Sequence, residues 1–94
     1  MKLAAPTDFD ILEALSDGRR NTAANLAHKL DRNRSYLNTR LPVLTDYGLL
    51  ERVGPAPNSG LYEITDRGRV VVELRNRYDD ADDLDALVDE RTAT

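Results

Sequence analysis

The stretch between Thr22 and Arg52 contains two short helical patterns separated by only a few residues, and no other feature limits the fold as strongly. In the first pattern, small and branched apolar residues recur at i, i+3, i+4 and i+7, so they share one helix face. These residues are Ala23, Leu26, Ala27 and Leu30. In the second pattern the shared face consists of Leu37, Leu41 and Leu44. Two helices joined by so short a turn are expected to cross and to bury both faces in one core, which is the layout of a helix-turn-helix.

Four residues are predicted to begin helices, because a hydroxyl or amide oxygen at the N-cap accepts a hydrogen bond from a free N–H of the first turn. They are Thr7, Thr22, Asn33 and Thr65. At Thr22 the free N–H groups offer a second role, the binding of a phosphate. Gly48 suits the position just after a helix. Pro42 lacks an N–H group and is expected to bend or tighten the second half of the helix that starts at Arg34.

Two apolar runs after Gly48 predict antiparallel strands at 49–53 and 61–64, with a further short strand near Arg20. The connection over 54–60 is longer than a tight turn and is expected to project as a wing. Candidate contacts of the wing with the backbone or minor groove of DNA are Arg52, Asn58 and Ser59. The tip has no Arg or Lys, which weakens its electrostatic contribution.

The outward face of the helix over 34–47 is polar, and its charged residues in the first half are basic. Hydroxyl, amide and guanidinium groups pair with base edges in the major groove of DNA. Candidate contacts in the first half of the helix are Arg34, Ser35, Tyr36, Asn38, Thr39 and Arg40. An ordinary solvated helix face is the alternative for this set, and Tyr36 is equally compatible with covering the edge of the core. Asp46 is expected to lie outside the DNA footprint.

Arg19 and Arg20 precede the first helical pattern, and they suit either phosphate contacts or a solvated turn. The packing faces of the outer helices are predicted from their apolar residues: Phe9, Ile11, Leu12 and Leu15 in the first, and Val70, Val71, Leu74 and Tyr78 in the last. Gly68 allows a close approach in the first turn of the last helix.

The formal net charge of −4 and the pI near 4.9 are unusual for a protein that binds nucleic acid. The charge is unevenly distributed, however. Residues 19–40 contain six basic residues and one acidic residue, whereas residues 79–94 contain seven acidic residues and one basic residue. The field near the central helices is therefore expected to be positive. The preference for Asp over Glu and for Arg over Lys resembles the surface of proteins from salt-loving archaea. In molar salt the Debye length falls to roughly 3 Å, so binding to DNA would depend on short-range contacts.

Composition argues against other classes of protein. There is no cysteine and only one histidine, His28, and no glycine-rich phosphate loop, so we expect no enzyme, cofactor or metal site. The aspartates of the acidic segment lack the spacing of a calcium loop. No apolar run approaches the length of a membrane span or a signal peptide, so a cytoplasmic protein with no membrane partner is expected.

The pattern from about Asp8 to Leu74 resembles a winged helix-turn-helix transcriptional regulator. The run LAHKLDRNRSYLNTRLPVLTDYGLLERV followed by GLYEITDRGR is especially similar to small archaeal regulators of the phage phi-H repressor-like type, relatives of the MarR and PadR groups. The resemblance implies a mainly α fold with a small antiparallel β-hairpin wing over residues 1–78. It also implies that the protein is a repressor that binds a specific sequence of double-stranded DNA, with bases read early in the helix over 34–47. Pro42 departs from the family pattern.

The acidic segment at 79–94 has apolar residues at helical spacing, Leu84, Leu87 and Val88, which suit a short dimerisation helix. A homodimer would place two DNA-reading helices about 34 Å apart and would require a palindromic operator. Two alternatives remain: a winged-helix adaptor that binds a protein in a transcription complex, and a sensor whose DNA binding a small-molecule effector loosens. The sequence identifies neither an operator nor an effector.

Overall fold

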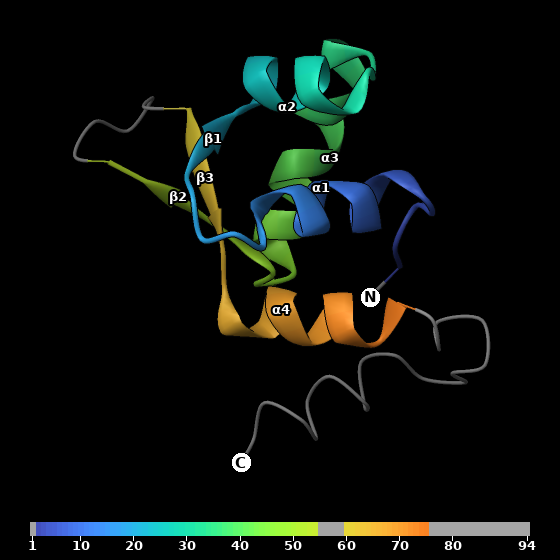
Figure 1. Cartoon of the computed structure of the whole chain (residues 1–94), viewed down its shortest axis with the longest axis vertical. Coiled ribbons are helices and arrows are strands. Elements are labelled where there is room, and N and C mark those ends of the chain that lie inside the picture. The colour runs from blue at the N-terminus through green and yellow to red at the C-terminus, as the bar shows by residue number, and fades with distance from the viewer. Residues whose placement is uncertain (1, 55–59, 76–94) are drawn as a thin grey trace.

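A computed structural model describes residues 2–54 and 60–75 of the 94-residue chain. The elements follow the predicted order of helix, short strand, two helices, two strands and helix (Figure 1). Their bounds are α1 Thr7–Leu15, β1 Asn21–Thr22, α2 Ala23–Leu30, α3 Arg34–Asp46, β2 Leu50–Val53, β3 Leu61–Ile64 and α4 Asp66–Glu73. Within the described ranges, no helix is long and apolar enough to cross a membrane. Tyr78 and the acidic segment at 79–94 lie outside the described residues.

Three of the four predicted N-caps are confirmed. Thr22 accepts a hydrogen bond from the N–H of Asn25, Asn33 accepts from Ser35 and Tyr36, and Thr65 accepts from Gly68. Each side-chain oxygen satisfies N–H groups that have no partner within the helix.

The prediction that Thr7 caps α1 is wrong. Pro6 occupies the N-cap and makes no side-chain capping bond, and Thr7 is the first residue of the helix. Its side chain is buried, and the hydroxyl oxygen accepts a hydrogen bond from Nη1 of Arg32 at 3.2 Å. A contact with the turn between α2 and α3 therefore replaces the expected local cap.

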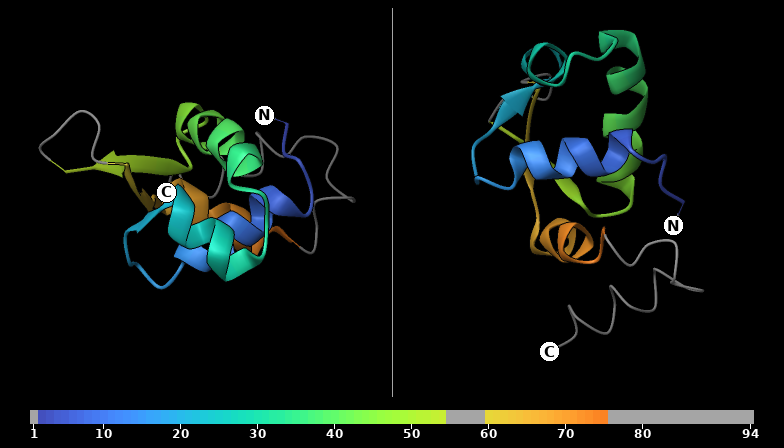
Figure 2. Two further views of the ribbon diagram at one scale, coloured as in Figure 1. Left: turned by 90° about the horizontal axis from the view of Figure 1, so that it is seen from above. Right: turned by 45° about the vertical axis from the view of Figure 1, so that its right-hand side comes forward.

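The predicted hairpin is confirmed, and β1 adds a third strand to it. The sheet is antiparallel in the order β1-β3-β2, with Arg52 opposite Tyr62 in the β2–β3 pair. The hairpin extends away from the helices, as Figures 1 and 2 show. Residues 55–59, which include the candidate wing contacts Asn58 and Ser59, lie outside the described residues.

The core lies between α1, α2, α3, α4 and the inner face of the sheet. The three leucines predicted for α3 are fully buried, as are Ile11, Leu12 and Leu15 of α1. Gly48 follows α3 with a φ of 79°, a left-handed conformation that glycine adopts without steric cost, so the predicted helix end is confirmed. The helix continues through the exposed Pro42 to Asp46.

Candidate nucleic-acid interface

The first half of α3 presents a polar face to solvent. Its side chains are exposed, whereas Leu37 and Leu41 on the opposite face are fully buried. The exposed residues of this face are Arg34, Ser35, Tyr36, Asn38 and Thr39. The structure thus brings together five of the six predicted α3 residues. Tyr36 is 43% exposed, so a large part of its side chain is open to solvent.

Local hydrogen bonds fix the start of this face. Oδ1 of Asn33 accepts from the N–H groups of Ser35 at 2.8 Å and Tyr36 at 3.3 Å. One turn further on, the hydroxyl group of Thr39 donates to the carbonyl oxygen of Ser35 at 3.2 Å. The Thr39 oxygen retains its capacity to accept a hydrogen bond from an incoming group, such as a base amino group.

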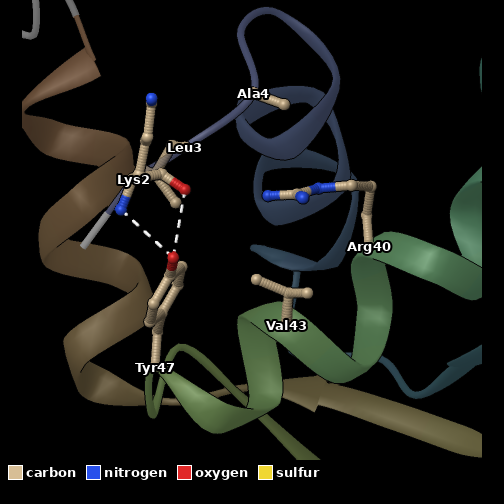
Figure 3. A pocket seen from close by; sticks show the side chains of 6 residues that line it. All are labelled: Lys2, Leu3, Ala4, Arg40, Val43 and Tyr47. Carbon is tan, nitrogen blue, oxygen red and sulfur yellow. Dashed lines mark hydrogen bonds between the residues drawn. The ribbon is translucent and has the colours of Figure 1, made fainter.

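Arg40, the sixth predicted residue, points elsewhere. Its Nε donates to Oδ1 of Asp8 at 3.0 Å and its Nη2 donates to Oδ2 at 2.7 Å. Asp8 is fully buried, and the Arg40 side chain is only 18% exposed. The hydrogen bonds that Arg40 donates to Asp8 raise the pKa of its guanidinium group. Figure 3 shows the guanidinium group extending from α3 towards the chain segment that carries Ala4.

The basic residues before α2 differ in their surroundings. Nε of Arg20 lies 3.1 Å from Oε2 of Glu63 on β3, although the Arg20 side chain is still 59% exposed. The N–H of Arg19 donates to Oδ1 of Asp17 at 2.9 Å, and its side chain is exposed. Thr22 caps α2, as described above. These three residues lie close together in the chain at the N-terminal end of α2, where free N–H groups favour an anion.

Arg52 lies at the base of the hairpin and is held by Tyr62 on the neighbouring strand. Nε of Arg52 donates to Oη of Tyr62 at 3.2 Å, and the guanidinium carbon lies 5.5 Å from the centre of the Tyr62 ring. Arg52 also lines a hollow of about 330 Å³ beside the second half of α3, together with Pro42, Thr45 and Asp46. The exposed guanidinium group is therefore oriented by a buried aromatic ring.

Comparison with known families agrees with this arrangement. Residues 5–51 match the family model described as winged helix-turn-helix DNA-binding, which covers half of the chain. The chain belongs to the winged helix-turn-helix DNA-binding family. A search of curated proteins finds no match.

Solved structures show the same fold for this winged helix. The oxidised form of MarR from Escherichia coli matches 93% of the chain at 24% identity with a TM-score of 0.64, and the reduced form matches 96% at 24% identity with a TM-score of 0.65. A MarR family protein from Bacillus stearothermophilus matches 98% at 20% identity with a TM-score of 0.66. The matches cover 60%, 65% and 71% of those chains, respectively, so the winged helix spans less than two thirds of the two E. coli structures.

Ion pairs between elements reduce the positive charge that the sequence suggests for the winged helix. Three of the six basic residues in the range 19–40 face a carboxylate from α1 or β3. The pairs are Arg20–Glu63, Arg32–Asp10 and Arg40–Asp8. Among the described residues, Arg19, Lys29 and Arg34 take part in no such ion pair. The positive charge that remains available for phosphate is thus smaller than the local sequence predicts.

The sequence did not predict that two carboxylates of α1 pair with arginines near the candidate interface. Asp10 pairs with Arg32 and with Arg75 at 2.8 Å each, and Asp8 pairs with Arg40. Both acids lie in the first turn of a helix, where a favourable interaction with the helix dipole is a sufficient local explanation. No spacing in the sequence relates them to arginines more than twenty residues away.

Proposed function

We propose that this chain is a transcriptional regulator that binds a specific sequence of double-stranded DNA and acts as a repressor. One observation carries the proposal: the first half of α3 exposes a set of hydrogen-bonding side chains, whereas its leucines hold the helix in the core. Such a helix fits the major groove, where base edges carry a sequence-dependent pattern of donors and acceptors. The resemblance to phage-repressor-like regulators supports repression as the mode of action.

Within α3, we assign base contacts to the short polar side chains. Ser35, Asn38 and Thr39 pair with base edges, and Tyr36 makes an apolar contact with a thymine methyl group or a sugar. Arg34, at the start of the helix, reaches a guanine or a phosphate. We leave Arg40 out of the contact set, because Nε and Nη2 of its guanidinium group both donate hydrogen bonds to Asp8.

The remaining contacts position the protein on the DNA backbone. Arg19, Arg20 and Thr22 meet a phosphate at the start of α2, and Arg52 meets a second phosphate from the base of the wing. Asn58 and Ser59, which lie outside the described residues, would contact the backbone or minor groove from the wing tip. The domain is proposed to span residues 1–78, and residues 79–94 to support a homodimer. The protein is proposed to act in the cytoplasm of a salt-loving archaeon.

Selection from a pool of random duplexes, followed by fluorescence anisotropy, tests this function. The purified protein is titrated with the selected duplex and with a scrambled duplex, from low to molar potassium chloride. We expect tighter binding to the selected duplex, with a preference that persists at high salt because base contacts do not depend on counterion release. Equal binding to both duplexes, lost at modest salt, would contradict sequence-specific recognition.

A protein-binding adaptor is the competing function, and the internal pairing of Arg20, Arg32 and Arg40 favours it by lowering the attraction to phosphate. The same experiment separates the two functions. An adaptor would bind neither duplex at any salt concentration. Its partner would instead be a protein that contacts the exposed face of α3.

A further inference from the structure

The carboxylate of Asp8 receives three hydrogen bonds although it is fully buried. Two come from Arg40 on α3, and the third comes from the N–H of Ala4 to Oδ2 at 2.7 Å. A buried carboxylate is stable only when donors satisfy its oxygens, so these three contacts depend on one another. Asp8 therefore joins three parts of the molecule: the N-terminal segment, α1 and α3.

This connection is part of a closed ring of contacts. Tyr47, at the C-terminal end of α3, accepts from the N–H of Lys2 at 3.2 Å and donates to the Lys2 carbonyl oxygen at 3.3 Å. Figure 3 shows these contacts on one side of a hollow of about 430 Å³ and Arg40 on the other. The N-terminal segment thus reaches α3 at Tyr47 and reaches Arg40 through Asp8.

The ring matters for α3 because that helix packs mainly against α2 and β2. The long side chain of Arg40 provides a link from α3 to α1, and it leaves the helix directly after Asn38 and Thr39. A helix moves largely as a rigid body, so a change at Arg40 shifts the exposed face as well. Selective base contacts require placement to within about 0.5 Å.

We propose that Asp8 is a positioning residue for DNA recognition, which sets the orientation of α3 through Arg40 so that the exposed side chains of α3 meet the base edges. This inference rests on the proposed function. Asp8 does not touch DNA in this arrangement. It acts on selectivity, which is the ratio of the dissociation constants for the scrambled and the selected duplex.

The test compares Asp8→Asn with Asp10→Asn. Both variants remove a carboxylate from the first turn of α1 that is paired with arginine, but Asp10 pairs with Arg32 and Arg75 and has no ion pair with α3 among the described residues. Binding is measured at a temperature at which circular dichroism shows both variants to be folded. We expect Asp8→Asn to lower the selectivity about tenfold, the contribution of one good base contact. Asp10→Asn should leave the selectivity unchanged.

A double-mutant cycle with Arg40→Lys then separates positioning from direct contact. Lysine keeps the charge but cannot form the paired hydrogen bonds to Asp8. If Arg40 acts through Asp8, Arg40→Lys lowers the selectivity of the wild type and adds little in the Asp8→Asn background. If Arg40 instead contacts DNA, the two losses add and the proposal is wrong. Should Asp8→Asn not fold, Asp8→Glu takes its place in the cycle with the same expected result.

The outcomes for the proposed function and for this inference are distinct. A wild-type protein that selects no duplex would overturn both. A selective wild type with an equally selective Asp8→Asn variant would overturn the positioning role alone. An equal loss of selectivity in Asp8→Asn and Asp10→Asn would also overturn it, because general loosening of α1 would then explain the effect.

Discussion

Gly68 in the first turn of α4 lies against the backbone carbonyl group of Leu49, and a β-carbon at position 68 would overlap with that oxygen. The same β-carbon would lie 2.7 Å from Cγ1 of Ile64. The Leu49 carbonyl oxygen also accepts a hydrogen bond from the N–H of Thr65 at 3.1 Å, which limits its freedom to move. The absence of a side chain at Gly68 therefore allows α4 to pack against the end of the α3–β2 connection.

Gly68→Ala is expected to lower the free energy of unfolding by about 3 kcal/mol, because backbone atoms must move to admit the methyl group. Gly60→Ala is the matched control. Gly60 has a φ of 72°, and no atom of the described residues beyond its chain neighbours lies within 4 Å of its β-carbon position, so its substitution carries only the conformational cost of about 1 kcal/mol. Urea unfolding followed by circular dichroism measures both values. Equal losses would contradict a steric role for Gly68.

Thr65 connects the end of α3 to the start of α4. Its hydroxyl group donates to the Gly48 carbonyl oxygen at 2.6 Å, and its oxygen accepts from the N–H of Gly68 at 3.0 Å. Thr65→Val removes both bonds and is expected to lower the unfolding free energy by about 1–2 kcal/mol. Thr65→Ser keeps the hydroxyl group and should lose much less. Thermal unfolding of the two variants checks this, and similar losses would mean that the methyl group stabilises the protein as much as the hydroxyl group does.

Replacing Asn38 and Thr39 together by alanine is expected to abolish most of the selectivity for the selected duplex. Each well-placed base contact contributes about 1–3 kcal/mol of discrimination, and both side chains are exposed on α3. Asp46→Ala, at the other end of the same helix, serves as the control. It should tighten binding to the selected and scrambled duplexes by the same factor. Unchanged selectivity in the double variant, measured by anisotropy, would exclude these residues as the base-reading pair.

Arg52→Ala is expected to weaken binding to both duplexes equally, because a phosphate contact carries no sequence information. The slope of log affinity against log salt concentration should fall by about one. Tyr62→Phe removes the hydroxyl group that accepts from Arg52 but keeps the ring, so its loss of affinity should be smaller. Salt titrations of the three proteins test this. A fall in selectivity with an unchanged salt slope would instead assign a base contact to Arg52.

Features that depend on neighbouring residues in the chain were predictable from the sequence. The leucine pattern of α3, the Asn33 cap and the glycine after the helix each involve groups within one or two turns, and the structure confirms all three. The exposed face of α3 followed from the same periodicity. Its assignment to DNA contact stays a prediction.

Features that depend on distant residues were not predictable. Thr7 has a hydroxyl group that suits an N-cap, but this hydroxyl oxygen accepts a hydrogen bond from Arg32, which lies 25 positions away. The DNA contact of Arg40 stays a prediction, but its hydrogen bonds to Asp8, 32 positions away, could not be predicted from the sequence. Helix periodicity predicts on which side of its own helix a residue lies. It does not say which neighbouring helix meets a side chain as long as arginine.

The ion pairs of Arg32 and Arg40 have a consequence for how such a regulator would be distributed in a cell. Chromosomal DNA offers about 10⁶ or more competing sites, and these sites retain a protein through phosphate contacts alone. Because these two arginines are already paired with carboxylates, the chromosome would sequester fewer copies. A small number of molecules per cell would then suffice to keep one operator occupied.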